Sequence, residues 1–173
     1  MSTTRSHVPG TDRSRTVPGI DPRGPRFTAG ITLVVFAVVL LTAPAPFGVL
    51  LLVLQTAFFA VGAGRGVQHT PTAYLFRKLV RPRLSAPAHL EDPTPPRFAQ
   101  AVGLGFAVVA LVGYLAGVTL LGAIAAGFAL AAALLNAVFG FCLGCEVYLL
   151  ARRLTATTSN LNNTHTTKEE VTA

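Results

Sequence analysis

The residues of this sequence best suited to chemistry are its two cysteines. They lie three positions apart in the segment FCLGCE (residues 141–146), so Cys142 and Cys145 form a CxxC pair. Residues three apart share one side of a helix, with Cβ atoms about 5–6 Å apart. A disulfide needs about 3.5–4.5 Å, so the backbone must adjust, and Gly140 and Gly144 are suited to that adjustment. The pair is therefore a candidate for thiol redox chemistry.

The chemistry of this pair depends on where the preceding helix ends. If a new helix begins at Cys142, the helix dipole lowers the pKa of that thiol, which makes Cys142 the nucleophile and Cys145 the resolving thiol. Glu146 then manages the proton on the resolving thiol. If one helix runs unbroken from Val118 to Arg153, both thiols stay in apolar surroundings and only pack. The sequence leaves both arrangements open.

Metal and cofactor binding are not predicted. A zinc site needs more ligands than two thiols. Neither His69 nor His89 has the spacing to the cysteines that zinc sites show. We therefore expect no metal and no cofactor.

Two long stretches without charge contain the elements that must position the motif. Charged residues make up 12% of the chain, about half the roughly 25% of a soluble domain. None occurs between Arg26 and Arg65, and the stretch from Arg97 to Glu146 is equally free of charge. A membrane-spanning helix needs roughly 20 residues, so each stretch holds two spans. The predicted spans are Phe27–Ala43, Phe47–Ala63, Phe98–Ala116 and Val118–Phe139.

These spans predict an all-α, multi-pass protein of the cell membrane, with its membrane domain over residues 20–154. A disordered N-terminal arm (1–19) and a disordered C-terminal tail (155–173) flank that domain. All 14 Lys and Arg lie before the first span, between the second and third, or after the fourth. This positive-inside pattern predicts that both termini are cytoplasmic. The basic charge then faces anionic lipid, and no nucleic-acid partner is expected.

The chain also reads as a duplicated hairpin. DPRGPRF (Asp21–Phe27) precedes the first span, and DPTPPRF (Asp92–Phe98) precedes the third. Each copy ends in an apolar and basic segment that begins with Tyr-Leu, at Tyr74 and at Tyr148. Because each copy contains two spans, we expect two parallel-repeated hairpins with short amphipathic helices beside the membrane.

The repeated motif predicts which side chains lie at the membrane interface. Arg26 and Arg97 are expected to snorkel to lipid phosphates, and Tyr74 and Tyr148 are expected at the same level. The aspartates that open the two motifs either pair with these arginines or cap the helices.

Two polar side chains fall inside the spans. Gln55 lies in the middle of the second span, and Asn136 lies near the inner end of the fourth. Such amides either mark a substrate path or form a hydrogen bond between helices. The small residues of the fourth span allow close contact within the bundle or across a homo-oligomer.

The motifs DPRGPRF, RPRL with EDPxPPRFAQ, and above all NAVFGFCLGCEVYLL resemble the bacterial domain-of-unknown-function family 4395. The resemblance covers roughly Ile20 to Leu154. It implies a small integral membrane protein without an assigned activity, and association with a thioredoxin-like protein or a sulfurtransferase.

Three functions follow from these observations, and whether the protein is an enzyme stays open. The first is a thiol-redox or sulfur-handling component that uses the CxxC pair at the cytoplasmic membrane face. The second is a non-enzymatic scaffold or assembly protein with packing cysteines. The third is a small-solute channel or carrier that uses Gln55 and Asn136.

Overall fold

The computed structural model describes residues 19–87 and 89–155, and most of these residues are helical. Four helices are long and apolar enough to cross a membrane. They are α1 (Arg23–Thr42), α2 (Pro46–Arg65), α4 (Thr94–Leu115) and α5 (Thr119–Leu134), the last continued by η4 (Leu135–Phe139). Among the described residues, β pairing is limited to a bridge between Ile20 and Glu91. The predicted all-α class and its four candidate spans are therefore confirmed.

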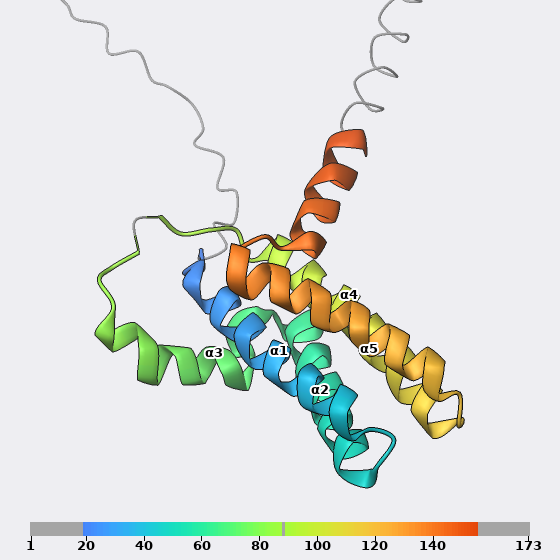
Figure 1. The fold of residues 1–173 in the computed structure, drawn as a ribbon. Helices are drawn as coiled ribbons and strands as arrows, with labels where there is room; N and C mark the ends of the chain where they lie inside the picture. The colour runs from blue at the N-terminus through green and yellow to red at the C-terminus, as the bar shows by residue number, and fades with distance from the viewer. Residues whose placement is uncertain (1–18, 88, 156–173) are drawn as a thin grey trace, which may run out of the picture.

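The four long helices form a ring in which each packs against two others. α1 packs against α2 and α5, and α4 packs against the same two helices (Figure 1). The buried centre of the ring consists of Phe36, Val39, Leu52, Phe59, Ala107, Ala110, Tyr114, Ala125, Ala126 and Ala129. The outward faces keep large apolar side chains exposed, with Leu41 at 85% and Leu120 at 72%. An apolar surface of this extent is what lipid covers in a membrane protein.

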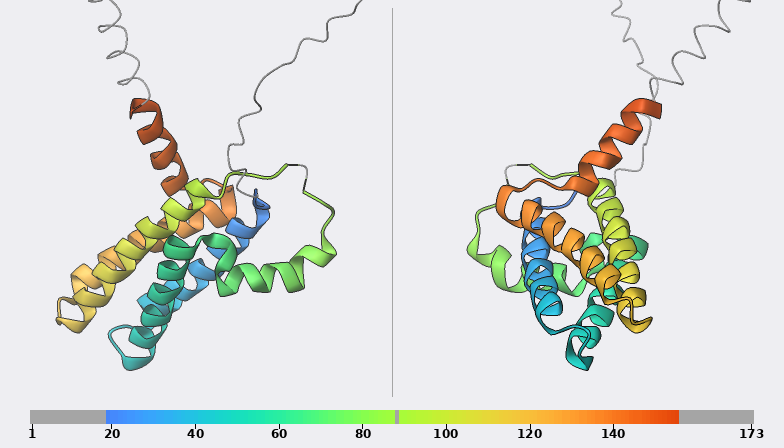
Figure 2. Two further views of the ribbon diagram at one scale, coloured as in Figure 1. Left: turned by 180° about the vertical axis from the view of Figure 1, so that it is seen from behind. Right: turned by 45° about the vertical axis from the view of Figure 1, so that its right-hand side comes forward.

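The two ends of the bundle differ in charge. The α1–α2 turn and the α4–α5 turn lie together at one end (Figures 1 and 2). At the α4–α5 turn, a Cβ on Gly113 would lie 2.6 Å from the backbone nitrogen of Gly122, so only glycine permits this approach. The opposite end holds the start of α1, the segment between α2 and α4, and the helix over residues 143–155. Every described Lys and Arg belongs to this second end, which we call the basic end.

The segment between α2 and α4 runs away from the bundle at the basic end (Figure 2). It contains η1 (Val67–His69), α3 (Pro71–Leu75), η2 (Phe76–Val80) and η3 (Arg81–Arg83). Phe76 is buried against the ring of Phe27, at 5.7 Å between centroids, which holds the segment on α1. This segment supplies the short helices that the sequence predicted beside the spans.

An aspartate precedes the first residue of α1 and of α4, the two helices that begin at the basic end. The Asp21 carboxylate accepts the backbone N–H of Arg23 at 3.0 Å, and the Asp92 carboxylate accepts that of Thr94 at 2.8 Å. The first backbone N–H groups of a helix lack partners within the helix, so each bond stabilises a helix start. Of the two roles predicted for these aspartates, the structure shows capping. The helices also begin four residues before the predicted spans, because proline is tolerated in a first turn.

The Asp92 cap predicts a pH dependence of stability. The hydroxyl and the backbone N–H of Thr94 both donate to the Asp92 carboxylate, and they lower its pKa below the ordinary value of 3.8. A lowered folded-state pKa stabilises the fold above that ordinary value, and this contribution is lost as the pH falls through the folded-state pKa. Asp92→Asn is therefore expected to flatten the loss of stability below pH about 4, measured by thermal unfolding in detergent.

The asparagine variant keeps an oxygen that caps the helix, so its stability near neutral pH should stay close to wild type. Parallel stability curves for the two proteins below pH about 4 would show that Asp92 contributes nothing to acid unfolding.

Candidate functional site

The CxxC pair lies at a break between two helices. α5 and η4 end at Phe139, and Gly140 takes a left-handed backbone conformation with φ of 70°. Its N–H donates to the carbonyl oxygen of Asn136 at 3.0 Å, which satisfies one of the last carbonyls of the helix. A second helix then covers residues 143–155. Of the two arrangements that the sequence left open, the broken helix is the one observed.

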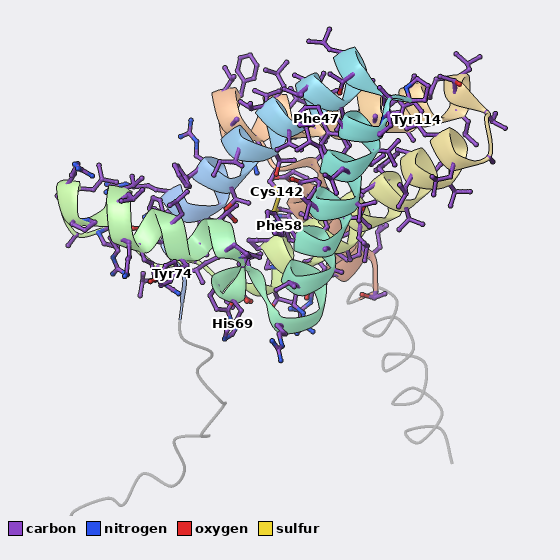
Figure 3. The ribbon with its side chains drawn as sticks, turned by 90° about the horizontal axis from the view of Figure 1, so that it is seen from below. Phe47, Phe58, His69, Tyr74, Tyr114 and Cys142 are labelled. Carbon is purple, nitrogen blue, oxygen red and sulfur yellow. A yellow bond between two sulfur atoms is a disulfide. The ribbon has the colours of Figure 1, made fainter. Side chains whose placement is uncertain are left out.

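Cys142 caps this second helix. The backbone N–H of Cys145 donates to the Cys142 sulfur at 3.4 Å, which is the bond that an N-cap side chain makes. The two sulfur atoms form a disulfide, and the Cα atoms of the pair lie 5.2 Å apart. Both cysteines are half-buried, and Figure 3 shows Cys142 with the yellow sulfur–sulfur bond beside it. A CxxC pair at a helix N-terminus is the setting in which proteins stabilise a reactive thiolate.

Gly144, between the two cysteines, holds the motif against α4. A Cβ at Gly144 would lie 2.7 Å from both the Cα and the Cβ of Ala99. Contacts that short do not occur, so the backbone can approach α4 this closely only at a glycine. The disulfide is therefore fixed by packing between the new helix and a membrane span.

The cysteines line a cavity of about 580 Å³ between α1, α4, α5 and the CxxC segment. A volume of this size is within the range of small-molecule sites. Part of the lining consists of alanine and glycine, which leave the space open: Ala29, Ala99, Gly103, Ala129, Ala132, Ala133, Gly140 and Gly144. Its polar lining comes from Arg26, Thr28, Thr32, His89, Glu91, Gln100 and Asn136, together with the two cysteines.

The two motif arginines contact helix ends, and their predicted contact with lipid phosphates stays a prediction. Arg26 Nη2 donates to the carbonyl oxygen of Val138 at 3.3 Å. Arg97 donates to the carbonyl oxygens of Ala63 and Gly64, both at 2.7 Å. The last carbonyls of a helix have no partner within the helix, and these guanidinium groups supply one. Each arginine belongs to one hairpin and caps the last span of the other.

The remaining predicted site residues are dispersed. Glu146 is exposed and lies outside the cavity lining, with its backbone N–H donating to the Cys142 carbonyl oxygen at 3.0 Å. Tyr74 is exposed on α3 and Lys78 lies over its ring, at 5.0 Å from the centroid. Tyr148 packs on Phe98, at 5.6 Å between ring centroids. Their proton-transfer and membrane-interface roles stay predictions.

The two intramembrane amides differ in their surroundings. Gln55 is buried and donates to the Thr32 hydroxyl at 3.3 Å, which is a hydrogen bond between α1 and α2. Asn136 lines the cavity close to the cysteines. Gln55 thus forms a hydrogen bond between helices, and of the two amides only Asn136 lines the cavity.

Gln55→Leu is expected to destabilise the protein by about 0.6 kcal/mol, the average for a hydrogen bond between membrane helices. The reaction of the cysteines with a thiol reagent should stay unchanged, because Gln55 lies outside the cavity lining. Unfolding in detergent and maleimide labelling measure the two effects. A large loss of labelling with little loss of stability would place Gln55 in the site instead.

Gln100 and Glu91 line the cavity and were not predicted from the sequence, and His89, which the sequence suggested only as a metal ligand and excluded, lines it too. Gln100 follows Arg97 by three positions and so lies on the same face of α4, which is a usable signal. His89 Nε2 and Glu91 Oε1 lie 3.4 Å apart at the basic end. Their segment has no helical periodicity from which a shared face could be predicted. In the described ranges, no three His, Cys, Asp or Glu side chains come together to hold a metal.

Comparison with known proteins identifies the chain at the level of a family. Residues 20–153 match the family model "Domain of unknown function (DUF4395)". No curated protein matches the chain. No solved structure matches it either.

Proposed function

The chain belongs to the DUF4395 family, whose description names no activity, so we propose a function from its own residues. The protein is a membrane-bound thiol-redox or sulfur-handling component, and Cys142 and Cys145 carry its electrons or its persulfide sulfur. The observation that best supports this proposal is the disulfide at the N-terminus of the helix over residues 143–155, in which both cysteines are half-buried. Buried cysteines are inert, whereas this pair is half-buried and lies at a helix N-terminus.

Exchange between the disulfide and a dithiol partner needs no other oxidant or reductant. A thiolate of a soluble dithiol partner attacks the Cys142 sulfur, the bond between Cys142 and Cys145 breaks, and the Cys145 sulfur leaves with the electron pair and takes up a proton. The second partner thiol then attacks the mixed disulfide and releases Cys142. The partner ends as a disulfide, and this protein ends as a dithiol. Transfer of persulfide sulfur starts from the reduced pair. The Cys142 thiolate attacks the outer sulfur of a partner persulfide, the sulfur–sulfur bond of that persulfide breaks, and the partner leaves as a thiolate.

The basic end supports the choice of partner and side. Arg77, Lys78, Arg81 and Arg83 are exposed on the segment between α2 and α4, at the same end of the bundle as the CxxC segment. A basic surface at this end fits the cytoplasmic side of the cell membrane, with the chain termini on that side. It also suits a thioredoxin-like or sulfurtransferase partner with an acidic docking face.

Maleimide labelling tests this proposal. The full-length protein is labelled in intact cells and in opened vesicles, with and without prior reduction, and Cys142→Ala/Cys145→Ala is the control. Labelling that needs both opened vesicles and reductant supports a cytoplasmic, redox-active pair. Protection of both thiols until detergent is added contradicts the proposal and favours the scaffold, in which the cysteines only pack.

A further inference from the structure

We propose that the cavity beside the disulfide binds a lipid-soluble quinone, which accepts the two electrons of the reduced CxxC pair. This inference rests on the proposed thiol-redox function and names the second substrate of the same site. It follows from three features of the cavity: its graded lining, two amides without partners, and the sulfur atoms in its wall.

The lining of the cavity changes along the membrane. Phe59, Phe106 and Phe128 line it towards the middle of the spans. Arg26 and the cysteines line it at the basic end. An occupant therefore needs an apolar body among aromatic rings and a polar group near a guanidinium.

Two amides in this lining lack hydrogen bonds. Within the described part of the chain, the side chains of Gln100 and Asn136 have no hydrogen-bond partner, and both residues are half-buried. Both side chains line the cavity, so an occupant there can accept hydrogen bonds from them. Their N–H groups and those of Arg26 are donors that suit carbonyl oxygens. A quinone ring presents two such oxygens on a flat apolar body.

The position of the sulfur pair supplies the chemistry. The Cys142 thiolate adds to the quinone ring, forming a carbon–sulfur bond, and the ring takes up the electron pair. The Cys145 thiolate then attacks the Cys142 sulfur, so the disulfide forms, the carbon–sulfur bond breaks and its pair stays on the ring. The protons of the two thiols end on the two quinone oxygens. The dithiol is oxidised by two electrons, and the quinone becomes a quinol.

The test uses full-length protein in detergent, reduced and then freed of reductant without oxygen. Decylubiquinone is added, quinol is followed by its absorbance, and remaining thiols are counted by alkylation. We expect one quinol for each disulfide formed and a rate that saturates with quinone. Cys142→Ser/Cys145→Ser should form no quinol.

A matched pair of variants places the reaction in the cavity. Ala132 lines the cavity, and Ala131 is its exposed neighbour on α5. Ala132→Leu should slow quinol formation at least about tenfold, because it displaces the ring from the sulfur, whereas Ala131→Leu should not. Exchange with oxidised glutathione reports the integrity of the pair. It should stay unchanged in Ala131→Leu and should slow less than quinol formation does in Ala132→Leu.

The outcomes separate this inference from the proposed function. Exchange with glutathione but no quinol, or a stable quinone adduct on cysteine instead of a disulfide, overturns the quinone site and leaves the proposed function standing. Equal slowing of both reactions by Ala132→Leu also overturns it. Failure of both reactions in the wild-type protein overturns the inference and the proposed function together.

Discussion

Cys145→Ser is expected to trap a mixed disulfide between Cys142 and its protein partner, at least about tenfold above the wild-type level. Cys142 caps the helix over residues 143–155, so its thiolate faces the free N–H groups of the first turn. Without the resolving thiol of Cys145, the mixed disulfide formed at Cys142 cannot be released by internal attack. Acid-quenched membranes on a non-reducing gel, followed by mass spectrometry of the shifted band, measure the trapped species.

Cys142→Ser is the matched control. It leaves the Cys145 thiol, whose own backbone N–H is directed at residue 142, and it should trap little partner protein. Equal trapping by the two variants would contradict the assignment of Cys142 as the nucleophile. No trapping by either, in a protein whose thiols react with maleimide, would restrict the exchange to small molecules.

Gly144→Ala is expected to destabilise the protein by about 1–3 kcal/mol, the usual cost of an added methyl group in a packed site. The new Cβ would meet the Cα and Cβ of Ala99 at 2.7 Å, and neither atom is the end of a flexible side chain. The helix over residues 143–155 must then move off α4 and carry the cysteines with it. Unfolding in detergent measures the loss, and the rate of exchange with oxidised glutathione reports the displacement.

Gly127→Ala supplies the control for this prediction. A Cβ at Gly127 meets nothing within 4 Å, so alanine should be neutral or stabilise α5 by about 0.5–1 kcal/mol. If Gly144→Ala behaves like Gly127→Ala, the contact with Ala99 does not position the motif. An unchanged rate of exchange in a destabilised Gly144→Ala protein would assign Gly144 to packing alone.

The number and placement of the long helices could be predicted from sequence because charge is excluded from the hydrocarbon region. The free intervals after Arg26 and after Arg97 each had to hold two helices, and they do. The break at Gly140 could not be decided in this way. The residues around it suit a continuous apolar helix as well as a broken one, and the contacts that accompany the break, such as Gly144 on Ala99, come from distant parts of the chain.

The cavity and the contacts of the arginines were beyond sequence reasoning for the same reason. The space beside the disulfide arises where small residues of three helices face one another, and no local pattern encodes that meeting. Arg26 was expected to reach lipid because its sequence position is interfacial. Its observed acceptor, the carbonyl of Val138, is supplied by the other hairpin.

The crossed arginine caps have a consequence for synthesis in the cell. A chain enters the membrane from its N-terminal side, so α1 and α2 are inserted before the second hairpin exists. The carbonyl groups of Ala63 and Gly64 have no guanidinium partner until Arg97 is synthesised. Arg26, by contrast, is already present when the last span is inserted. A chain that stops after the first hairpin leaves these two carbonyl groups without the Arg97 guanidinium. Both helix ends have their arginine partners only after the second hairpin has packed against the first.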